Sequence, residues 1–332
     1  MFWIASHQMQ AIAQGYLVYD MTGSAKLLGL VSASGAIPLL GLALVGGAIA
    51  DRVNRKRIIQ AGQIAGTAIG LFIAISIATE TITWVHFLGV GMVLGAIWST
   101  LVPARHAMLP HLVKREQLGN AVALIAAGMG AASLLAPAIA GVLYASIGPA
   151  GVYFTVAGMS TIAVLLTTSI SEDSKAAPEA RRPLSEMFSE IKDGLRYLWH
   201  SQMIKLLMLI GFVFVFLSAP LQALLPVLIL DVYHRETGAL GLLVSGMGMG
   251  ALVGALVIAS WGERRRGLLI IGAAFLSGGA LVALAAGPIY LAAVPILVVF
   301  GLGNGLQWSL NQVLIMSRIE DGYRGRVMSI YM

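Results

Sequence analysis

The chain has no cysteine, and charged side chains are scarce for its length. Without cysteine, disulfide bonds and thiolate metal sites are excluded, although a cysteine-free chain is compatible with any cellular compartment. Asp, Glu, Lys and Arg together make up 11% of the 332 residues, whereas 58% are hydrophobic. A soluble domain could not hide that much apolar surface in one core. The composition therefore predicts an integral membrane protein.

Motifs of common catalytic and nucleotide sites are also missing. The sequence contains no Gly-x-Ser-x-Gly, no Walker phosphate loop and no His-Glu-x-x-His, and its six histidines show no ligand spacing. Glycine clusters around Gly91, Gly248 and Gly303 lie inside apolar stretches without a preceding strand, which favours close helix packing over dinucleotide binding. We therefore expect no enzyme, no cofactor, no metal site and no self-powered pump.

Apolar stretches of about twenty residues, the length that crosses a bilayer as a helix, recur along the chain. Met1 opens directly into the first, short stretch, which predicts a truncated first helix and no cleavable signal. The predicted spans are 1–19, 27–50, 58–78, 83–101, 120–146, 152–170, 204–230, 239–261, 268–286 and 289–309.

Positive charge is distributed unevenly between the predicted loops. With the amino end inside, the cytoplasmic loops and the tail hold all 21 lysines and arginines except Lys26 and Arg235. Cytoplasmic loops of membrane proteins are enriched in Lys and Arg, so both chain ends are predicted to be cytoplasmic. The net charge of +6 forms no stripe on a soluble face, and we expect no nucleic-acid partner.

A polar linker divides the chain. Residues 171–182 are charged, Ala, Ser and Pro residues, which cannot stay in lipid. In 183–199 apolar residues repeat at helical spacing beside Lys192 and Arg196, which predicts a helix lying on the inner leaflet with membrane lipid as its partner. The predicted domains are an N-terminal bundle over 1–170, a linker with an amphipathic helix over 171–203, and a C-terminal bundle over 204–332.

One loop carries a specific motif. Gly47-x-x-x-Asp51-Arg52-x-x-Arg55-Lys56-Arg57 resembles the loop between helices 2 and 3 in the major facilitator superfamily of secondary transporters, with Asn54 where that family usually has Gly. The resemblance implies an all-α membrane protein of two helical bundles. A constant shift along the chain also places Asp51 on Glu263 and Arg52 on Arg264. Like-oriented repeats of this kind build the two halves of such proteins.

The superfamily pattern has six helices in each half, whereas the second half of this chain supplies four before Met332. We therefore expect a major facilitator fold truncated to about ten transmembrane helices, without helices 11 and 12. The acidic residue of the motif loop faces the start of helix 11 in the family. A weakened gate, and loss of transport by the truncated chain, are expected on that basis.

Further motifs resemble the bacterial exporter branch that includes enterobactin and macrolide efflux carriers. Thr22-Gly23-Ser24, Pro103-Ala104-Arg105 and Leu118-Gly119-Asn120-Ala121 carry this resemblance, which implies export of a bulky organic molecule against protons. In the fifth span, the positions Gly130, Ala136, Pro137 and Gly141 are similar to the helix-5 motif of proton antiporters, with Ala for Gly at 136 and 140. A kink and packing device is an equally good interpretation.

Polar residues within the spans are the candidates for substrate contact, because helices 1, 4, 7 and 10 line the cavity in this fold. His7, Gln10 and Gln14 share one helical face, and Asn304, Gln307 and Asn311 repeat that spacing. Trp98, Gln222 and Trp308 would add aromatic and amide contacts. Contacts between helices are the alternative role for these side chains.

Gate and coupling residues are predicted separately. The resemblance implies an inner gate formed by Gly47, Asp51, Arg52, Arg55 and Lys56, with Glu263 and Arg264 in the second half. No Asp or Glu lies deep in a span, so His7, with an ordinary pKa near 6.5, is the mid-span candidate for proton coupling. Asp20 and Asp231 lie at matching outer helix ends and are candidates for capping turns.

Three interpretations stay open. The first is a monomeric secondary exporter in the bacterial plasma membrane that works by alternating access. An importer of the same fold would accumulate substrate with the gradient, and a non-transporting membrane scaffold would show no stabilisation by ligands. The sequence does not name the substrate.

Overall fold

The computed structural model describes residues 1–114, 117–170, 196–261, 266–287 and 289–319, and in these ranges the chain is helical, without strands. In chain order the elements are α1 Phe2–Thr22, α2 Ala25–Ala33, α3 Ala36–Arg52, α4 Arg55–Ala78, α5 Trp84–Leu112, α6 Leu118–Thr168, α8 Gln202–Val227, the π-helix η2 Leu228–Val232, α9 Thr237–Trp261, α10 Arg266–Ala286 and α11 Tyr290–Arg318. This confirms the prediction of an all-helical protein.

Local sequence sets several helix ends. α1 ends at Gly23, whose φ of 57° is the left-handed conformation that glycine adopts without steric cost. Asn54 is the N-cap of α4, and its side-chain oxygen accepts hydrogen bonds from the backbone N–H groups of Lys56 at 2.9 Å and Arg57 at 3.4 Å. Asn at this position therefore satisfies the free amides of the first turn. Asn54, which stands where the family usually has Gly, therefore serves as the N-cap of α4.

Two helices extend beyond their predicted ends. The fourth span was expected to stop at Leu101 and continue as a loop to Gln117, but α5 runs to Leu112. Leu101, Ala104 and Met108 are buried along one face of this extension, so packing holds it helical past Pro103. α11 likewise passes the expected end at 309 and reaches 318, again with buried apolar residues in its added turns.

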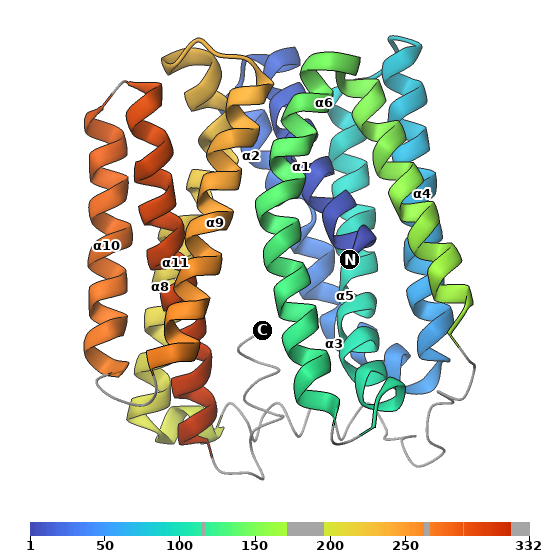
Figure 1. The fold of residues 1–332 in the computed structure, drawn as a ribbon. Coiled ribbons are helices and arrows are strands. Elements are labelled where there is room, and N and C mark those ends of the chain that lie inside the picture. The colour runs from blue at the N-terminus through green and yellow to red at the C-terminus, as the bar shows by residue number, and fades with distance from the viewer. Residues whose placement is uncertain (115–116, 171–195, 262–265, 288, 320–332) are drawn as a thin grey trace. The chain divides into compact units, whose positions relative to one another are not determined.

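Two predicted elements are interrupted. The second span is divided at Ser34 and Gly35 into α2 and α3. A Cβ on Gly35 would lie 3.0 Å from the backbone oxygen of Gly91, so the interruption falls where this segment crosses α5 closely. The long helix α6 contains Gly148 at φ 72° and ψ 176°, which is not helical. Gly148 therefore separates the two arms of α6, which correspond to the fifth and sixth predicted spans (Figure 1).

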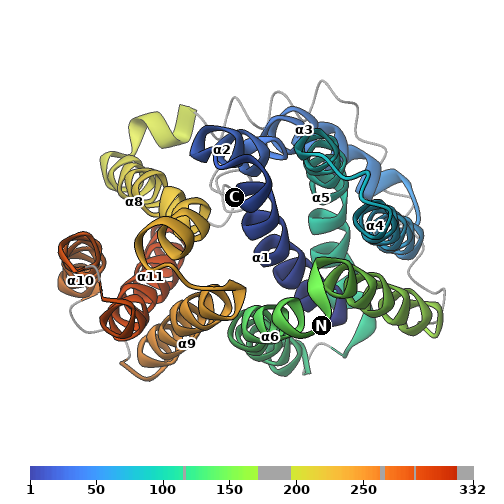
Figure 2. The same ribbon diagram turned by 90° about the horizontal axis from the view of Figure 1, so that it is seen from above.

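The chain forms two compact units. The first contains Met1–Arg181 together with Ala223–Ser245, and the second contains Arg182–Gln222 with Gly246–Met332. In the first unit α1 lies beside α6, and α3 beside α5; in the second, α10 lies beside α11 (Figures 1 and 2). The last turn of α8 and the first turns of α9 thus pack with the first unit. The predicted domains 1–170, 171–203 and 204–332 stay a prediction.

The surface of both units is apolar, as a membrane requires. Leu40 is 75% exposed, Phe275 78% and Leu291 79%. Eight stretches of the described residues are long and apolar enough to span a bilayer. One of them contains both arms of α6, and α1 is not among them. Separating the arms of α6 and adding α1 gives the ten predicted spans.

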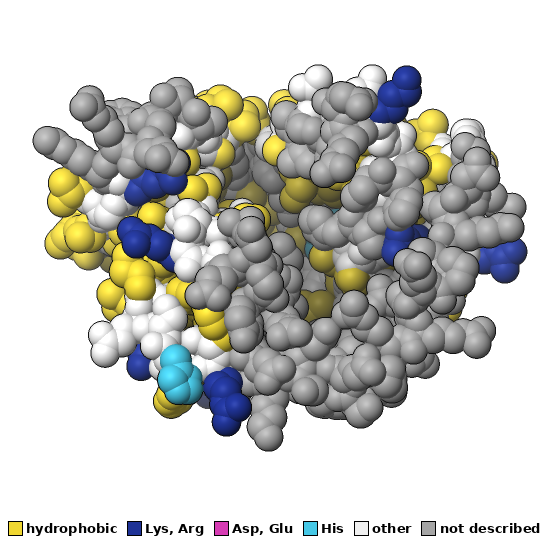
Figure 3. Space-filling model, turned by 90° about the horizontal axis from the view of Figure 1, so that it is seen from below, with side chains coloured by type: hydrophobic (Ala, Val, Ile, Leu, Met, Phe, Trp, Pro, Cys, Tyr) yellow, Lys and Arg dark blue, Asp and Glu magenta, His cyan; other side chains and the backbone are white. Residues whose placement is uncertain are grey.

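Charged side chains gather at a helix end. Figure 3 looks onto the lower end of the view in Figure 1, where several Lys and Arg side chains lie among apolar ones. No acidic side chain is visible among the coloured atoms of this face. Of the predicted amphipathic helix 183–199, residues 183–195 lie outside the described residues, and 196–199 are helical.

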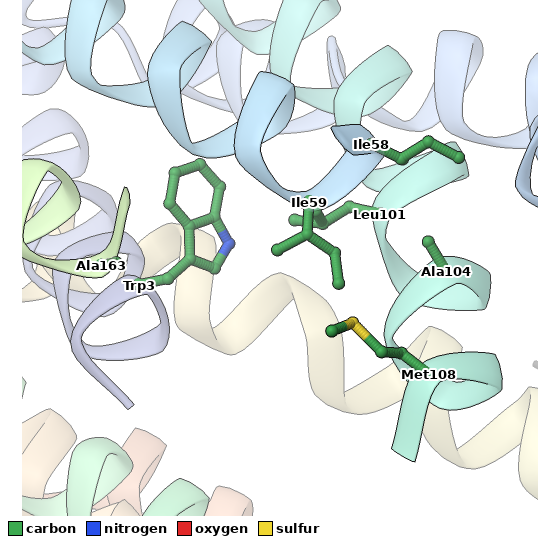
Figure 4. Close-up of a cluster of buried hydrophobic side chains, with 7 residues drawn as sticks. All are labelled: Trp3, Ile58, Ile59, Leu101, Ala104, Met108 and Ala163. Atoms are coloured by element: carbon green, nitrogen blue, oxygen red, sulfur yellow. The ribbon is translucent and has the colours of Figure 1, made fainter. Parts of the chain in front are cut away.

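Each unit has an apolar core. In the first unit, side chains from four helices meet in a cluster (Figure 4) made of Trp3, Ile58, Ile59, Leu101, Ala104, Met108 and Ala163. In the second, the cluster joins residue 198 and α8 to α10 and α11 through Leu198, Ile204, Leu207, Ile270, Leu310, Ile315 and Ile319. These clusters fix α1 and α11, which carry most of the candidate polar residues.

Candidate substrate cavity and gates

The first unit brings two predicted cavity residues together. The rings of His7 on α1 and Trp98 on α5 have centroids 4.9 Å apart and planes inclined at 57°. Both side chains are partly buried. The indole Nε1 of Trp98 is buried without a hydrogen-bond partner among the described residues. The pair thus offers an aromatic surface and a free donor within the bundle.

The two glutamines on the same face of α1 differ in environment. Gln10 is buried, and its Nε2 has no partner in the described part of the chain. Gln14 is partly buried. A buried amide donor without a partner costs free energy in an apolar interior. Gln10 is therefore available to a ligand.

Other polar residues of α1 already have partners. Gln8 Nε2 donates to Ser133 Oγ at 3.2 Å, and the hydroxyls of Ser6 and Ser160 are 3.3 Å apart. Both contacts join α1 to α6. The sequence did not predict a role for Ser6 or Gln8, and neither of them shares the spacing of the cavity candidates on α1. They hold the helices together.

In the second unit, the candidates of α11 lie on more than one face. Gln307 is 1% exposed, and both atoms of its amide lack a partner among the described residues. Asn311 is buried and Asn304 partly buried. Trp308, in contrast, is 55% exposed, and Gln222 on α8 is exposed. Within this unit, Gln307 and Asn311 thus lie in the interior, whereas Trp308 does not.

The predicted inner gate is only partly described. The side chains of Asp51 and Arg52 lie outside the described residues, as do Glu263 and Arg264, and nothing is placed at Gly47 beyond its helical backbone. Arg55 is the first residue of α4. Lys56 Nζ donates to the backbone oxygens of Thr168 at 3.0 Å and Ile170 at 2.6 Å, at the end of α6. A cation there stabilises the negative end of the helix dipole.

The helix-5 motif forms a close helix crossing. A Cβ on Gly241 of α9 would lie 2.5 Å from the backbone oxygen of Pro137, and one on Gly141 would lie 3.0 Å from that of Thr237. Ala136 is buried and Gly130 partly buried. Small residues let the backbones of α6 and α9 approach this closely. Packing is thus one role of this motif.

A hydrogen bond that the sequence did not predict joins α1 to the end of α8. Tyr19 Oη donates to Asp231 Oδ2 at 2.5 Å. Asp231 lies in the π-helix η2, and the sequence had predicted for it a helix end matching that of Asp20, the neighbour of Tyr19. The matching positions of Asp20 and Asp231 thus indicated this part of the molecule, although the sequence predicted that these acids cap turns.

Among the described residues, no group of three His, Asp or Glu side chains is placed to hold a metal ion. Helices that are apolar on the outside, with buried amides and an aromatic pair inside, are typical of a multi-pass membrane protein. The chain belongs to the major facilitator superfamily, in the family described as transmembrane secretion effectors, whose model matches residues 2–332. It is therefore a transporter, and not an enzyme, with a small-molecule substrate.

Similar proteins extend over nearly the whole chain. The enterobactin exporter EntS of Citrobacter koseri is 28% identical over 99% of this chain and 78% of its own length. The macrolide efflux protein A of Streptococcus pyogenes is 24% identical over 96% of this chain and 80% of its own. The multidrug efflux pump Tap of Mycolicibacterium fortuitum is 25% identical, over 80% and 66%.

Solved transporter structures share the fold. An inward-facing, unoccupied bacterial homologue of the lysosomal transporter Spinster has a TM-score of 0.77 and 13% identity, covering 99% of this chain and 75% of its own. The nucleoside transporter NupG has a TM-score of 0.70 and 15% identity, covering 99% and 84%. At these identities the likeness shows the fold alone, and it confirms the predicted major facilitator fold.

Proposed function

We propose that this chain exports a bulky organic molecule across the bacterial plasma membrane, as a monomer that couples export to protons. Two helical bundles would rock about a central site and expose it to each side in turn. The direction is supported by the relatives, which are named as an enterobactin exporter, a macrolide efflux protein and a multidrug efflux pump.

The observation that carries the proposal is the His7–Trp98 ring pair together with the buried amide of Gln10, which lies on the same face of α1 as His7. Sites for organic molecules are mostly apolar and aromatic, with a few polar groups that set orientation. Gln14 would extend this surface along α1. In the second unit, Asn304, Gln307 and Asn311 would contribute the corresponding amides, and Gln222 and Trp308 would add amide and aromatic contacts.

Proton coupling would depend on His7. No acidic residue lies deep in a span, and His7 is partly buried against Trp98 in the interior of the first unit. Replacing His7 with Gln keeps a hydrogen-bonding side chain but removes the titratable ring. We expect proton-driven export to fall at least tenfold while ligand-induced stabilisation persists. Unchanged proton-driven export would remove His7 from the mechanism.

The inner gate would combine Asp51 and Arg52 with Glu263 and Arg264, and both chain ends would be cytoplasmic. The gathering of basic side chains at one end of the helices supports this orientation (Figure 3). Membrane lipid is a further partner. Phe72, Val85 and Val93 line a shallow apolar groove along α4 and α5, and each is about half exposed.

A substrate-sensitivity screen tests export directly. Cells that express the protein should tolerate more of a toxic substrate and lose accumulated substrate in a manner that needs the proton gradient. Trp98→Ala should remove this resistance, and Phe72→Ala, on the lipid-facing groove, is the matched aromatic control. Gradient-driven accumulation would instead support an importer. A protein that no candidate ligand stabilises against heating would be a scaffold.

A further inference from the structure

The segment 223–245 connects the two compact units in an unusual way. It contains the last turns of α8, the π-helix η2 and the first turns of α9, and it packs with the first unit although the rest of α8 and α9 belongs to the second. Leu225, Ile229, Leu240 and Leu243 within it are at most 1% exposed. Any movement that separates this segment from the first unit would have to expose these four residues.

The contacts that hold the segment to α1 and α6 within the first unit include the following three. On α1, a Cβ on Gly15 would lie 3.2 Å from the Pro226 ring. The Gly141 and Gly241 backbones cross closely between α6 and α9. The third contact is the hydrogen bond from Tyr19 to Asp231. The first two contacts are close packing, and the third is a single charged hydrogen bond.

The local backbone of η2 positions the acid of this hydrogen bond. Tyr233 N donates to Leu228 O at 3.0 Å, five residues back, so the helix is wider here than an α-helix. π-helical turns of this kind are rare and recur at functional sites. Asp231 itself is exposed, whereas Tyr19 is only 6% exposed. The carboxylate is thus exposed while it accepts a hydrogen bond from the hydroxyl of a buried tyrosine.

We propose that Tyr19 and Asp231 form the latch of an outer gate, and that the transporter releases this hydrogen bond whenever it opens outward. The proposal relies on the orientation proposed above, in which this end of the helices faces outside. A charged hydrogen bond suits a latch, because it can exchange its partner for water when the seam parts. The packed glycine crossing would reclose the seam after release.

The absence of native cysteine permits a test that needs no substrate. Thr237 is 2% exposed at the α6–α9 crossing, which belongs to the seam between the segment 223–245 and helices α1 and α6. Thr237→Cys therefore reports whether this seam is open. In right-side-out vesicles, the labelling rate with a membrane-impermeant maleimide would be measured in the full chain. Tyr19→Phe and Asp231→Asn should each raise this rate about tenfold. The double variant should label no faster than the faster single variant, because both changes remove one bond.

Asp20→Asn is the matched control. Asp20 is an exposed acid at the same end of α1, and its neutralisation should leave the rate unchanged. Ser245→Cys, also buried, is a second reporter in case Thr237→Cys disturbs folding. Unchanged rates in Tyr19→Phe and Asp231→Asn with both reporters would overturn the latch, as would labelling only in inside-out vesicles. Faster labelling without any export would instead contradict the proposed function and leave the latch intact.

Discussion

At the scale of single residues, hydrogen bonding separates two groups of polar side chains inside the bundle. Gln8 bonds to α6, so it contributes to helix association. The amides of Gln10 and Gln307 are buried, and they have atoms without a partner among the described residues. An unpaired amide in an apolar interior costs about 1–3 kcal/mol. A position that carries this cost is better explained by contact with a ligand than by stability.

Gln10→Leu and Gln8→Leu should therefore have opposite effects. The first replaces an unpaired amide with an apolar side chain, so we expect unchanged or higher thermal stability and a loss of export of about tenfold. The second leaves Ser133 without its partner and should lower stability by about 1 kcal/mol, with export kept. Melting temperatures in detergent and export rates in cells give the two readouts. Loss of stability in Gln10→Leu would contradict a substrate role.

Lys56 gives a second prediction at this scale. Its ammonium group caps the end of α6 through the oxygens of Thr168 and Ile170. Lys56→Met keeps most of the aliphatic chain and removes these bonds, which should lower stability by about 1 kcal/mol. Arg57→Met, at an exposed neighbour, is the control and should have little effect. Loss of transport with unchanged stability would show that Lys56 acts in the gate and not as a cap.

At the scale of elements, small residues decide how closely the helices cross. α9 and α11 approach so closely that a Cβ on Gly250 would clash with the backbone at Val298 and Leu302, and one on Gly254 would meet Leu302 and Leu306. Without a hydrophobic driving force between helices in lipid, close backbone packing supplies much of the association. The glycine clusters noted in the sequence are thus helix contacts, as predicted.

Gly250→Ala tests this packing. The added methyl group meets backbone atoms that cannot rotate away, so we expect about 2 kcal/mol of destabilisation and poor yield of folded protein. Gly272→Ala on α10 is the matched control, because nothing lies within 4 Å of its Cβ position. It should be neutral or slightly stabilising, since Ala favours helices. Thermal unfolding of the purified variants measures both, and equal effects would contradict the role of the crossing.

At the scale of the whole molecule, the distribution of charge predicts the orientation, and single cysteines can test it. Thr81 and Lys114 are exposed at opposite ends of α5. With both chain ends in the cytoplasm, Thr81→Cys should react with an impermeant maleimide in intact cells. Lys114→Cys should react only after the membrane is permeabilised. The reverse pattern would invert the topology and place the Tyr19–Asp231 contact inside.

Sequence alone determined the class of molecule, the helices and the family. Composition and charge asymmetry are global properties, so ten spans and the family loop could be recognised without coordinates. Helix ends were less certain, because tertiary burial of Leu101 and Met108, not local propensity, extends α5 past Pro103. The interruption at Ser34 and Gly35 likewise depends on a crossing with α5.

For the candidate site, helical spacing predicted which residues share a face, but not which of them have partners. His7 and Trp98 are far apart in sequence, and only the packing of α1 against α5 makes them neighbours. Spacing could not show that Gln8 has a partner while Gln10 Nε2 has none in the described part of the chain, since that depends on what the adjacent helix presents. Asp231 reaches Tyr19 from a π-helical turn. No residue pattern in the sequence predicts where a helix widens into such a turn.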